Sequence, residues 1–274
     1  MVVAIAGDAP GAWAQTKITQ SGTPENLLTR QFTLIAGGFF AFNSTDIQVN
    51  NSSTGQDGTN INLEDDLGLD TFDATPFGEA RWRITPHHRI ELGIFPLNRD
   101  GDATAETELI IDDLVIPVGG QVKSSLDLVL GRVTYGYSFI NDGKKEAGIM
   151  VGAHIANLDY DVDLISTTGG SSSVSSTGDE FTAPLPHVGV MGGYAFRDDL
   201  VLDGRVVGFY VEVGDYTGWL LEAETKLTYM VWENVGLGLG ARYFRFSLNA
   251  DNSSFDGDLD FQFIGPTAFA VVTF

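Results

Sequence analysis

The chain contains no cysteine in its 274 residues. A disulfide framework, a thiolate metal site and a cysteine nucleophile are therefore all excluded. Basic residues are scarce too, since 15 Lys and Arg stand against 37 Asp and Glu and leave a net charge of −22. Nucleic-acid binding needs clustered positive charge, so this balance argues against a nucleic-acid partner. A solvated acidic surface and a surface that binds cations are both compatible with it.

Long hydrophobic runs are also missing. No stretch of about 18 apolar residues occurs, which excludes a helical membrane-spanning segment. The other structure that can satisfy every backbone group inside a bilayer is a closed β-barrel. The chain is instead rich in glycine (33) and in aromatic residues (18 Phe, 8 Tyr and 4 Trp), and its length fits one large β domain.

The stretch from Trp219 to Trp232 shows the pattern on which the fold prediction rests. One set of alternate residues is largely apolar: Trp219, Leu221, Ala223, Thr225, Leu227, Tyr229 and Val231. The other set carries Glu222, Glu224 and Lys226. Strand side chains alternate between faces, whereas at helical spacing these residues make a poor amphipathic helix. A soluble antiparallel sheet can alternate in the same way. The length, the terminal aromatics and the repetition of the pattern indicate a membrane-spanning barrel strand, apolar toward lipid and polar toward the lumen.

Similar alternation recurs along the chain. We predict ten strands, at residues 31–43, 74–84, 89–96, 123–139, 146–164, 181–196, 200–213, 219–232, 235–248 and 255–274. Tight turns are expected at 85–88, 141–145, 197–199 and 233–234. Longer loops follow the first and third strands, and a serine- and glycine-rich mobile loop follows the fifth (167–178). Short turns on one side and long loops on the other predict a closed up-and-down antiparallel transmembrane β-barrel. Eight or twelve strands stay open, because Glu108–Ile116 could form a hairpin inside or outside the wall.

The end of the chain carries a second signal. Phe274 is the last residue, and Val272 and Ala270 precede it at alternate positions. This ending resembles that of Gram-negative outer-membrane β-barrel proteins, in which it is the signal read by the barrel-assembly machinery. The resemblance implies contact with outer-membrane lipid and lipopolysaccharide, a periplasmic C-terminus, periplasmic tight turns and external long loops. The acidic segment L-E-D-D-L-G-L-D also resembles part of uncharacterised proteobacterial barrels, which implies no activity.

The start of the chain resembles the tail of a secretory signal peptide. Ala12-Trp13-Ala14 fits an A-x-A cleavage site before Gln15. We therefore expect residues 1–14 to be a signal-peptide remnant and residues 15–274 to be the barrel. A disordered N-terminus is the alternative. Residues 16–29 are expected to be a short polar lead-in.

The polar faces of the predicted strands bring many charges into the lumen. They are Glu79, Arg81, Arg83, Arg89, Glu91, Arg132, Asp203, Arg205, Glu222, Glu224, Lys226 and Arg242. This set predicts either a narrow water-filled pore with an ion preference or a salt-bridged plug, since small barrels are often packed with side chains. In both cases buried charges must be paired.

Two smaller groups are candidates for chemistry. His154 and His187 fall on adjacent strands and should lie close together in the lumen, either as a metal or acid/base pair or as part of a hydrogen-bonded network. Asp159, Asp161 and Asp163 alternate at the start of a predicted loop. They could hold Ca²⁺ or Mg²⁺ loosely at an acidic rim, or be solvated charges. We expect no other cofactor.

Two functions follow from these features. The first is a small passive porin-like channel or a structural surface protein, without enzymatic activity, because no catalytic constellation is evident. The alternative is a barrel enzyme of the lipid A acyl hydrolase or protease type, for which His154 and His187 are the only candidate bases. A soluble periplasmic β protein would instead be extracted without detergent.

Overall fold

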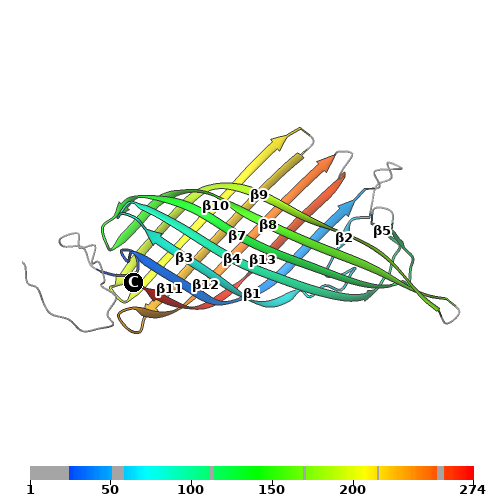
Figure 1. Cartoon of the computed structure of the whole chain (residues 1–274), viewed down its shortest axis with the longest axis horizontal. Helices are drawn as coiled ribbons and strands as arrows, with labels where there is room; N and C mark the ends of the chain where they lie inside the picture. The colour runs from blue at the N-terminus through cyan, green and yellow to red at the C-terminus, as the bar shows by residue number, and fades with distance from the viewer. Residues whose placement is uncertain (1–24, 51–58, 112–113, 169–170, 215, 252–255) are drawn as a thin grey trace, which may run out of the picture.

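The computed structural model describes residues 25–50, 59–111, 114–168, 171–214, 216–251 and 256–274. Over these ranges ten long antiparallel strands form a closed barrel (Figure 1). They are β1 (Phe32–Val49), β3 (Phe72–Arg83), β4 (His88–Thr104), β7 (Gln121–Asn141), β8 (Lys145–Thr168), β9 (Ser171–Arg197), β10 (Leu200–Val213), β11 (Tyr216–Met230), β12 (Val235–Asp251) and β13 (Asp256–Thr273). Pairing between β1 and β13, from Thr33 with Thr273 to Val49 with Gly257, closes the ring. The predicted fold class and the strand number of ten are confirmed.

Three short strands lie outside this ring. β2 (Ile61–Asn62) pairs with the end of β1, while β5 (Leu109–Ile111) and β6 (Leu114–Ile116) form a separate hairpin. The prediction of a hairpin within Glu108–Ile116 is therefore correct. In the part of the chain that the structure covers, no helix is long and apolar enough to cross a membrane.

The wall has the two faces that the alternation predicts. Outward side chains are apolar and remain exposed, as at Leu34 (50%), Ile94 (56%) and Leu239 (68%). Aromatic pairs lie toward both ends of this apolar surface, with Phe32 stacked on Trp82 near the tight turns and Phe42 against Phe72 further along the same strands. Such a band, with aromatics at its margins, is typical of a barrel surface in contact with lipid.

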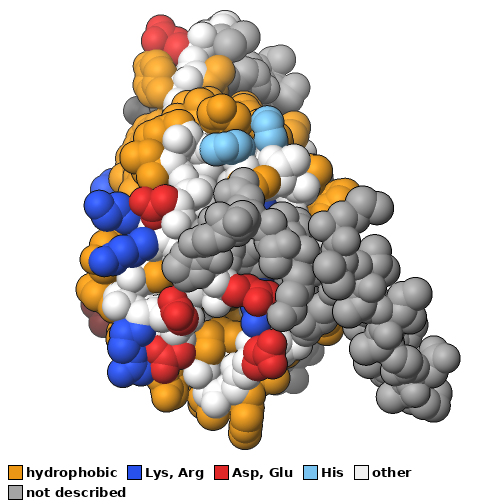
Figure 2. Space-filling model, turned by 90° about the vertical axis from the view of Figure 1, so that its left-hand side faces the viewer, with side chains coloured by type: hydrophobic (Ala, Val, Ile, Leu, Met, Phe, Trp, Pro, Cys, Tyr) orange, Lys and Arg blue, Asp and Glu red, His pale blue; other side chains and the backbone are white. Residues whose placement is uncertain are grey.

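The tight turns gather at one end of the barrel, together with the C-terminus (Figure 1). Figure 2 looks at this end and shows Lys, Arg, Asp and Glu side chains across it, with hydrophobic side chains at the margin. In the turn at 142–144, Gly143 has φ of 81°, a conformation that favours glycine. The backbone N–H groups of Lys145 and Lys144 donate to the Asp142 carboxylate and hold the pKa of Asp142 below its usual range.

Several strands extend further than the sequence pattern predicted. β4 continues to Thr104 rather than stopping at Pro96, and β1 continues to Val49. The predicted loop at 167–178 is wrong: β8 reaches Thr168, β9 begins at Ser171, and the two pair along this stretch. Residues 1–14, where a signal remnant was predicted, lie outside the described residues.

The N-terminal segment packs into the tight-turn end instead of serving only as a lead-in. Leu27 and Leu28 are 2% and 0% exposed. Asn26 fixes the segment, since its side-chain amide donates to the Gly143 carbonyl (2.5 Å) and its Oδ1 accepts the Leu28 N–H (2.9 Å). Arg30 donates to the Glu233 carbonyl (3.0 Å). This segment therefore covers part of the barrel opening at that end.

The opposite opening is covered by two segments. Residues 61–70 bury Ile61, Leu63, Leu67 and Leu69, and an added Cβ on Gly101 of β4 would lie only 2.5 Å from the Leu67 carbonyl oxygen. A glycine is thus required for this close approach. The β5–β6 hairpin contacts β1 through β5 and β9 through β6, strands on different sides of the ring, and therefore spans the opening.

Candidate functional site

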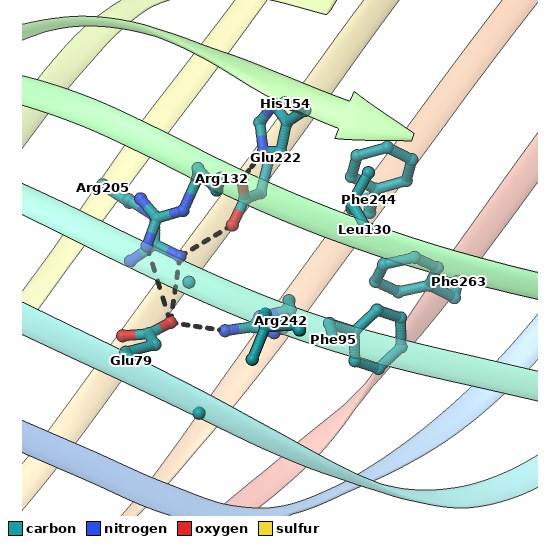
Figure 3. A pocket seen from close by; sticks show the side chains of 13 residues that line it. Glu79, Phe95, Leu130, Arg132, His154, Arg205, Glu222, Arg242, Phe244 and Phe263 are labelled. Atoms are coloured by element: carbon teal, nitrogen blue, oxygen red, sulfur yellow. Dashed lines mark hydrogen bonds and ion pairs between the residues drawn. The ribbon is translucent and has the colours of Figure 1, made fainter. Parts of the chain in front are cut away.

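Charged side chains fill the lumen near the tight-turn end. All twelve charged residues expected in the lumen face inward, and their side chains are no more than 10% exposed. They come from β3, β4, β7, β10, β11 and β12, so the layer joins opposite walls of the barrel. Figure 3 shows part of it, with Glu79, Arg132, Arg205, Glu222 and Arg242 directed toward one another.

Carboxylates each accept from several cations in this layer. Glu224 accepts from Arg242 (2.6 Å), Lys226 (2.9 Å) and Arg205, and Glu79 accepts from Arg242 (2.7 Å) and Lys226. Because buried charges are costly unless paired, this sharing makes the layer a single interdependent network. We call it the charged layer.

A second cluster of carboxylates and cations lies in the same layer. Glu91 accepts from Arg81 (3.1 Å) and Arg89 (3.0 Å), and Arg81 also donates to Asp203 (3.0 Å). Glu146 joins Arg89 (2.9 Å), Arg83 (2.9 Å) and Ser138 (2.5 Å). Glu146 was missed at the sequence level, although it shares the inward parity of His154 on the same strand.

The two predicted histidines do lie together. Their Nδ1 atoms are 3.1 Å apart, and each side chain is 1% exposed. His154 Nε2 lies 2.7 Å from Glu222, and His187 Nε2 lies 3.0 Å from the Thr134 hydroxyl. The arrangement is a buried chain of hydrogen bonds attached to the charged layer, which fits the network interpretation. Over the described ranges, no three His, Asp or Glu side chains are arranged to hold a metal ion.

Aromatic side chains form the next layer of the lumen. Phe39, Phe95, Phe244 and Phe263 pack with ring centroids 4.9–5.4 Å apart. Arg242 lies over the Phe77 ring at 5.0 Å and so connects this layer with the charged one. The sequence prediction placed these inward phenylalanines in strands but assigned them no role. Between the two layers, the cavity lined by Glu79, Arg132, His154 and Phe244 measures only about 20 Å³.

Above the aromatic layer the lumen turns apolar. A cavity of about 40 Å³ is lined by eleven hydrophobic residues: Leu126, Leu128, Leu130, Ala156, Leu158, Ala183, Leu185, Phe244, Phe246, Leu259 and Phe261. We call it the apolar chamber. Lumen positions of membrane barrels are usually polar, so this part of the interior departs from the expectation for a water-filled pore.

The predicted acidic and C-terminal residues lie on the outside of the wall. Asp159, Asp161 and Asp163 face outward in the middle of β8 rather than at a loop, because β8 continues past them. Asp159 is directly opposite Asp127 of β7. Binding of Ca²⁺ or Mg²⁺ there stays a prediction. Ala270, Val272 and Phe274 also face outward, and the backbone of Phe274 pairs with that of Phe32.

Arg99 was missed because β4 is longer than predicted. It is 2% exposed and donates to the Thr45 hydroxyl (2.9 Å), the Asp70 carbonyl (2.9 Å) and the Glu64 carboxylate. These bonds hold the segment at residues 61–70 against the wall. Arg99 lies at alternate spacing from Arg89 and Glu91, so a predicted strand that continued beyond Pro96 would have placed Arg99 on the inner face.

Solved structures provide the comparison for this architecture. The outer membrane protease OmpT from Escherichia coli matches over 89% of this chain and 97% of its own, with 14% identity and a TM-score of 0.58. This chain has the fold of an outer-membrane β-barrel. Two further structures resemble this chain more loosely. OprG of Pseudomonas aeruginosa matches over 92% of this chain and 99% of its own, with 13% identity and a TM-score of 0.39. The toluene transporter TodX of Pseudomonas putida matches over 92% of both chains, with 10% identity and a TM-score of 0.37. No protein-family model and no curated protein matches the chain. At these identities the likeness is one of fold alone.

Proposed function

We propose that the protein is an outer-membrane β-barrel of a Gram-negative bacterium that acts as a structural and surface component, with its lumen closed to passive flow. The charged layer supports this proposal most directly. Ion pairs join opposite walls across the lumen, and the cavity beside them, about 20 Å³, holds on the order of one water molecule. The segments over the two openings add to the closure.

Conductance in planar bilayers tests this proposal. The refolded wild-type chain is expected to insert without stable conductance steps, since hydrated ions find no continuous path. Insertion is verified independently, by protease protection and heat-modified gel mobility of the same proteoliposomes. Stable steps from the inserted wild-type protein would overturn the proposal.

The orientation belongs to the same proposal. We place the C-terminus and the tight turns in the periplasm, with the β8–β9 hairpin outside the cell. A tag inserted at 169–170 should then be labelled by antibody on intact cells, whereas a tag inserted at the 142–144 turn should require permeabilisation. The reverse pattern would contradict this orientation. Extraction into buffer without detergent would contradict the membrane location itself.

The enzymatic alternative has less support. His154 and His187 are its candidate bases, yet both are 1% exposed, and their ring nitrogens are engaged with Glu222, Thr134 and each other. A substrate would have to displace the charged layer to reach either ring. Loss of hydrolysis in an H154A/H187A variant of an active preparation would revive this alternative.

A further inference from the structure

The wall of the barrel is not fully hydrogen-bonded. β9 and β10 pair from Arg197 with Leu200 up to Val188 with Gly208, and the backbone ladder stops there. Beyond this point β9 pairs only with β8, and β10 only with β11. In Figure 1 the two strands run apart from this point. We call the unpaired stretch, between residues 182–187 of β9 and 209–213 of β10, the β9–β10 seam.

Two prolines account for the seam. The Ala195 N–H donates to the Lys144 carbonyl and therefore points toward β8. The backbone N–H and C=O groups of successive residues point alternately to the two neighbouring strands. The backbone groups of the even-numbered residues of β9 therefore point toward β10. Pro186 and Pro184 occupy the next two of these even positions, and proline has no N–H to donate. The β9–β10 hydrogen-bond ladder therefore ends at Val188, the last residue of β9 before these prolines that has an N–H to donate to β10.

Exposure on β10 indicates that the seam is open. Val211 has the lumen-facing parity of Arg205 and Val207, which are 6% and 1% exposed, yet Val211 is 38% exposed. On the outward face Tyr210 is 66% exposed, and its hydroxyl donates to Glu212 (3.0 Å). Apolar outward residues, such as Val188 and Val206, lie just below. The seam therefore opens at the margin of the apolar band.

A second interruption, between β3 and β4, is filled. Pairing there stops at Gly78 with Ile94, and Pro76 and Pro96 follow on the two strands. However, the Thr75 hydroxyl donates to the Pro96 carbonyl, and Leu69 bridges to Gly101 of β4. No described segment makes such backbone contacts across the β9–β10 seam. Both interruptions lie toward the end of the barrel opposite the tight turns. There they divide the ten-stranded wall into a group of four strands, β4, β7, β8 and β9, and a group of the remaining six.

The apolar chamber lies beside the open seam. Ala183 and Leu185 line it from the unpaired part of β9, and Phe246 and Leu259 line it from the six-stranded part of the wall. Phe244 belongs both to the chamber lining and to the aromatic layer, and Figure 3 shows this layer next to the charged one. The β5–β6 hairpin spans the opening above the chamber. Because two of its lining residues stand on the unpaired part of β9, the chamber adjoins the seam directly.

We propose that the apolar chamber takes up one alkyl chain of a lipid from the adjoining membrane leaflet through the β9–β10 seam. The lining offers carbon only, so a polar headgroup stays outside, near Tyr210 and Glu212. The cavity of about 40 Å³ holds only part of such a chain. Uptake therefore requires the two parts of the wall to separate at the seam, where no backbone hydrogen bond joins the described residues of β9 and β10.

Photolabelling of the full chain in phospholipid nanodiscs tests the proposal. The probe is a phospholipid with a diazirine near the end of one acyl chain, and adducts are mapped by mass spectrometry. We expect adducts on lumen-facing Leu128, Leu158 and Phe246 in addition to those on the lipid-facing surface. Adducts confined to outward residues in the wild-type protein would overturn the proposal.

A pair of matched variants separates the chamber from the surface. Ala156 lines the chamber and Ala153 faces outward on the same strand. A156F should reduce chamber adducts at least tenfold, whereas A153F should leave them unchanged. Folding of both is checked by circular dichroism and heat-modified gel mobility. Should A156F fail to fold, L158S makes the lining polar without filling it and should give the same loss. Unchanged chamber adducts in a folded A156F or L158S variant would contradict the proposal.

Engineered cross-links test the route, since the chain has no cysteine of its own. P186C/Y210C joins the strands across the seam, and V190C/V206C joins two residues that are directly paired below it. Closing the first pair, by oxidation or with a short bis-maleimide, should abolish chamber labelling, and the second pair should have no effect. Chamber labelling that persists after the first pair is cross-linked would overturn entry from the bilayer. Equal chamber labelling by a short-chain diazirine amphiphile dissolved in the buffer would overturn it as well.

Discussion

At the scale of single residues, Glu224 is the group on which the charged layer most depends. Its carboxylate is 1% exposed and is shared by Arg205, Lys226 and Arg242. E224Q keeps the shape but leaves these cations under-compensated, and breaking a buried pair typically costs ~3–5 kcal/mol. Urea unfolding in lipid vesicles should show a loss of that order. D199N, at the exposed Arg197–Asp199 pair, should cost much less, because solvent screens an ion pair at the surface. Equal losses in the two variants would contradict this ranking.

Residue parity could be predicted from the sequence, but residue partners could not. Alternation placed Glu79, Arg205 and Glu222 on the inner face, which is where they lie. That Arg205 bonds Glu79, 126 positions earlier in the chain, depends on the closure and stagger of the whole ring. No local pattern encodes that relation.

At the scale of strands, hydrophobic periodicity predicted the part of each element that crosses the apolar band. Beyond the band the outward positions become polar, as at Asp100 and Asp102 of β4, while pairing with β7 continues. The periodic signal disappears there although the strand does not. The serine-rich start of β9 is the extreme case, because its pairing with β8 holds it extended in spite of its composition.

The proline seam gives a prediction about an element. Restoring the missing donors with P184T/P186T should extend the β9–β10 ladder to Tyr210 and Glu212, whose exposed amides should then exchange with deuterium at least tenfold more slowly. Chamber labelling should fall in parallel. P76T/P96T, at the interruption that Thr75 and Leu69 already fill, should leave exchange at 209–213 unchanged. Identical exchange in P184T/P186T and the wild-type protein would exclude the prolines as the cause of the seam.

At the scale of the whole molecule, the N-terminal segment and then the charged layer follow one another along the lumen from the tight-turn end. The composition of residues 25–30 did not predict this packing, since its two leucines carry no periodic pattern. Asn26 and Arg30 anchor them through backbone carbonyls of distant turns. The order of the two barriers leads to a prediction about access from the tight-turn end.

Single cysteines in the otherwise cysteine-free chain can measure the two barriers separately. Thr228 and Thr134 both face the lumen and are 1% and 0% exposed, and Thr134 lies against His187 within the network. In the wild-type background T228C and T134C should both react slowly with a charged thiol reagent. L27N/L28N removes the apolar contacts of the N-terminal segment and should speed the reaction of T228C at least tenfold. T134C should stay slow because the charged layer still separates it from solvent. Equal acceleration at both positions would mean that the N-terminal segment alone keeps the lumen closed.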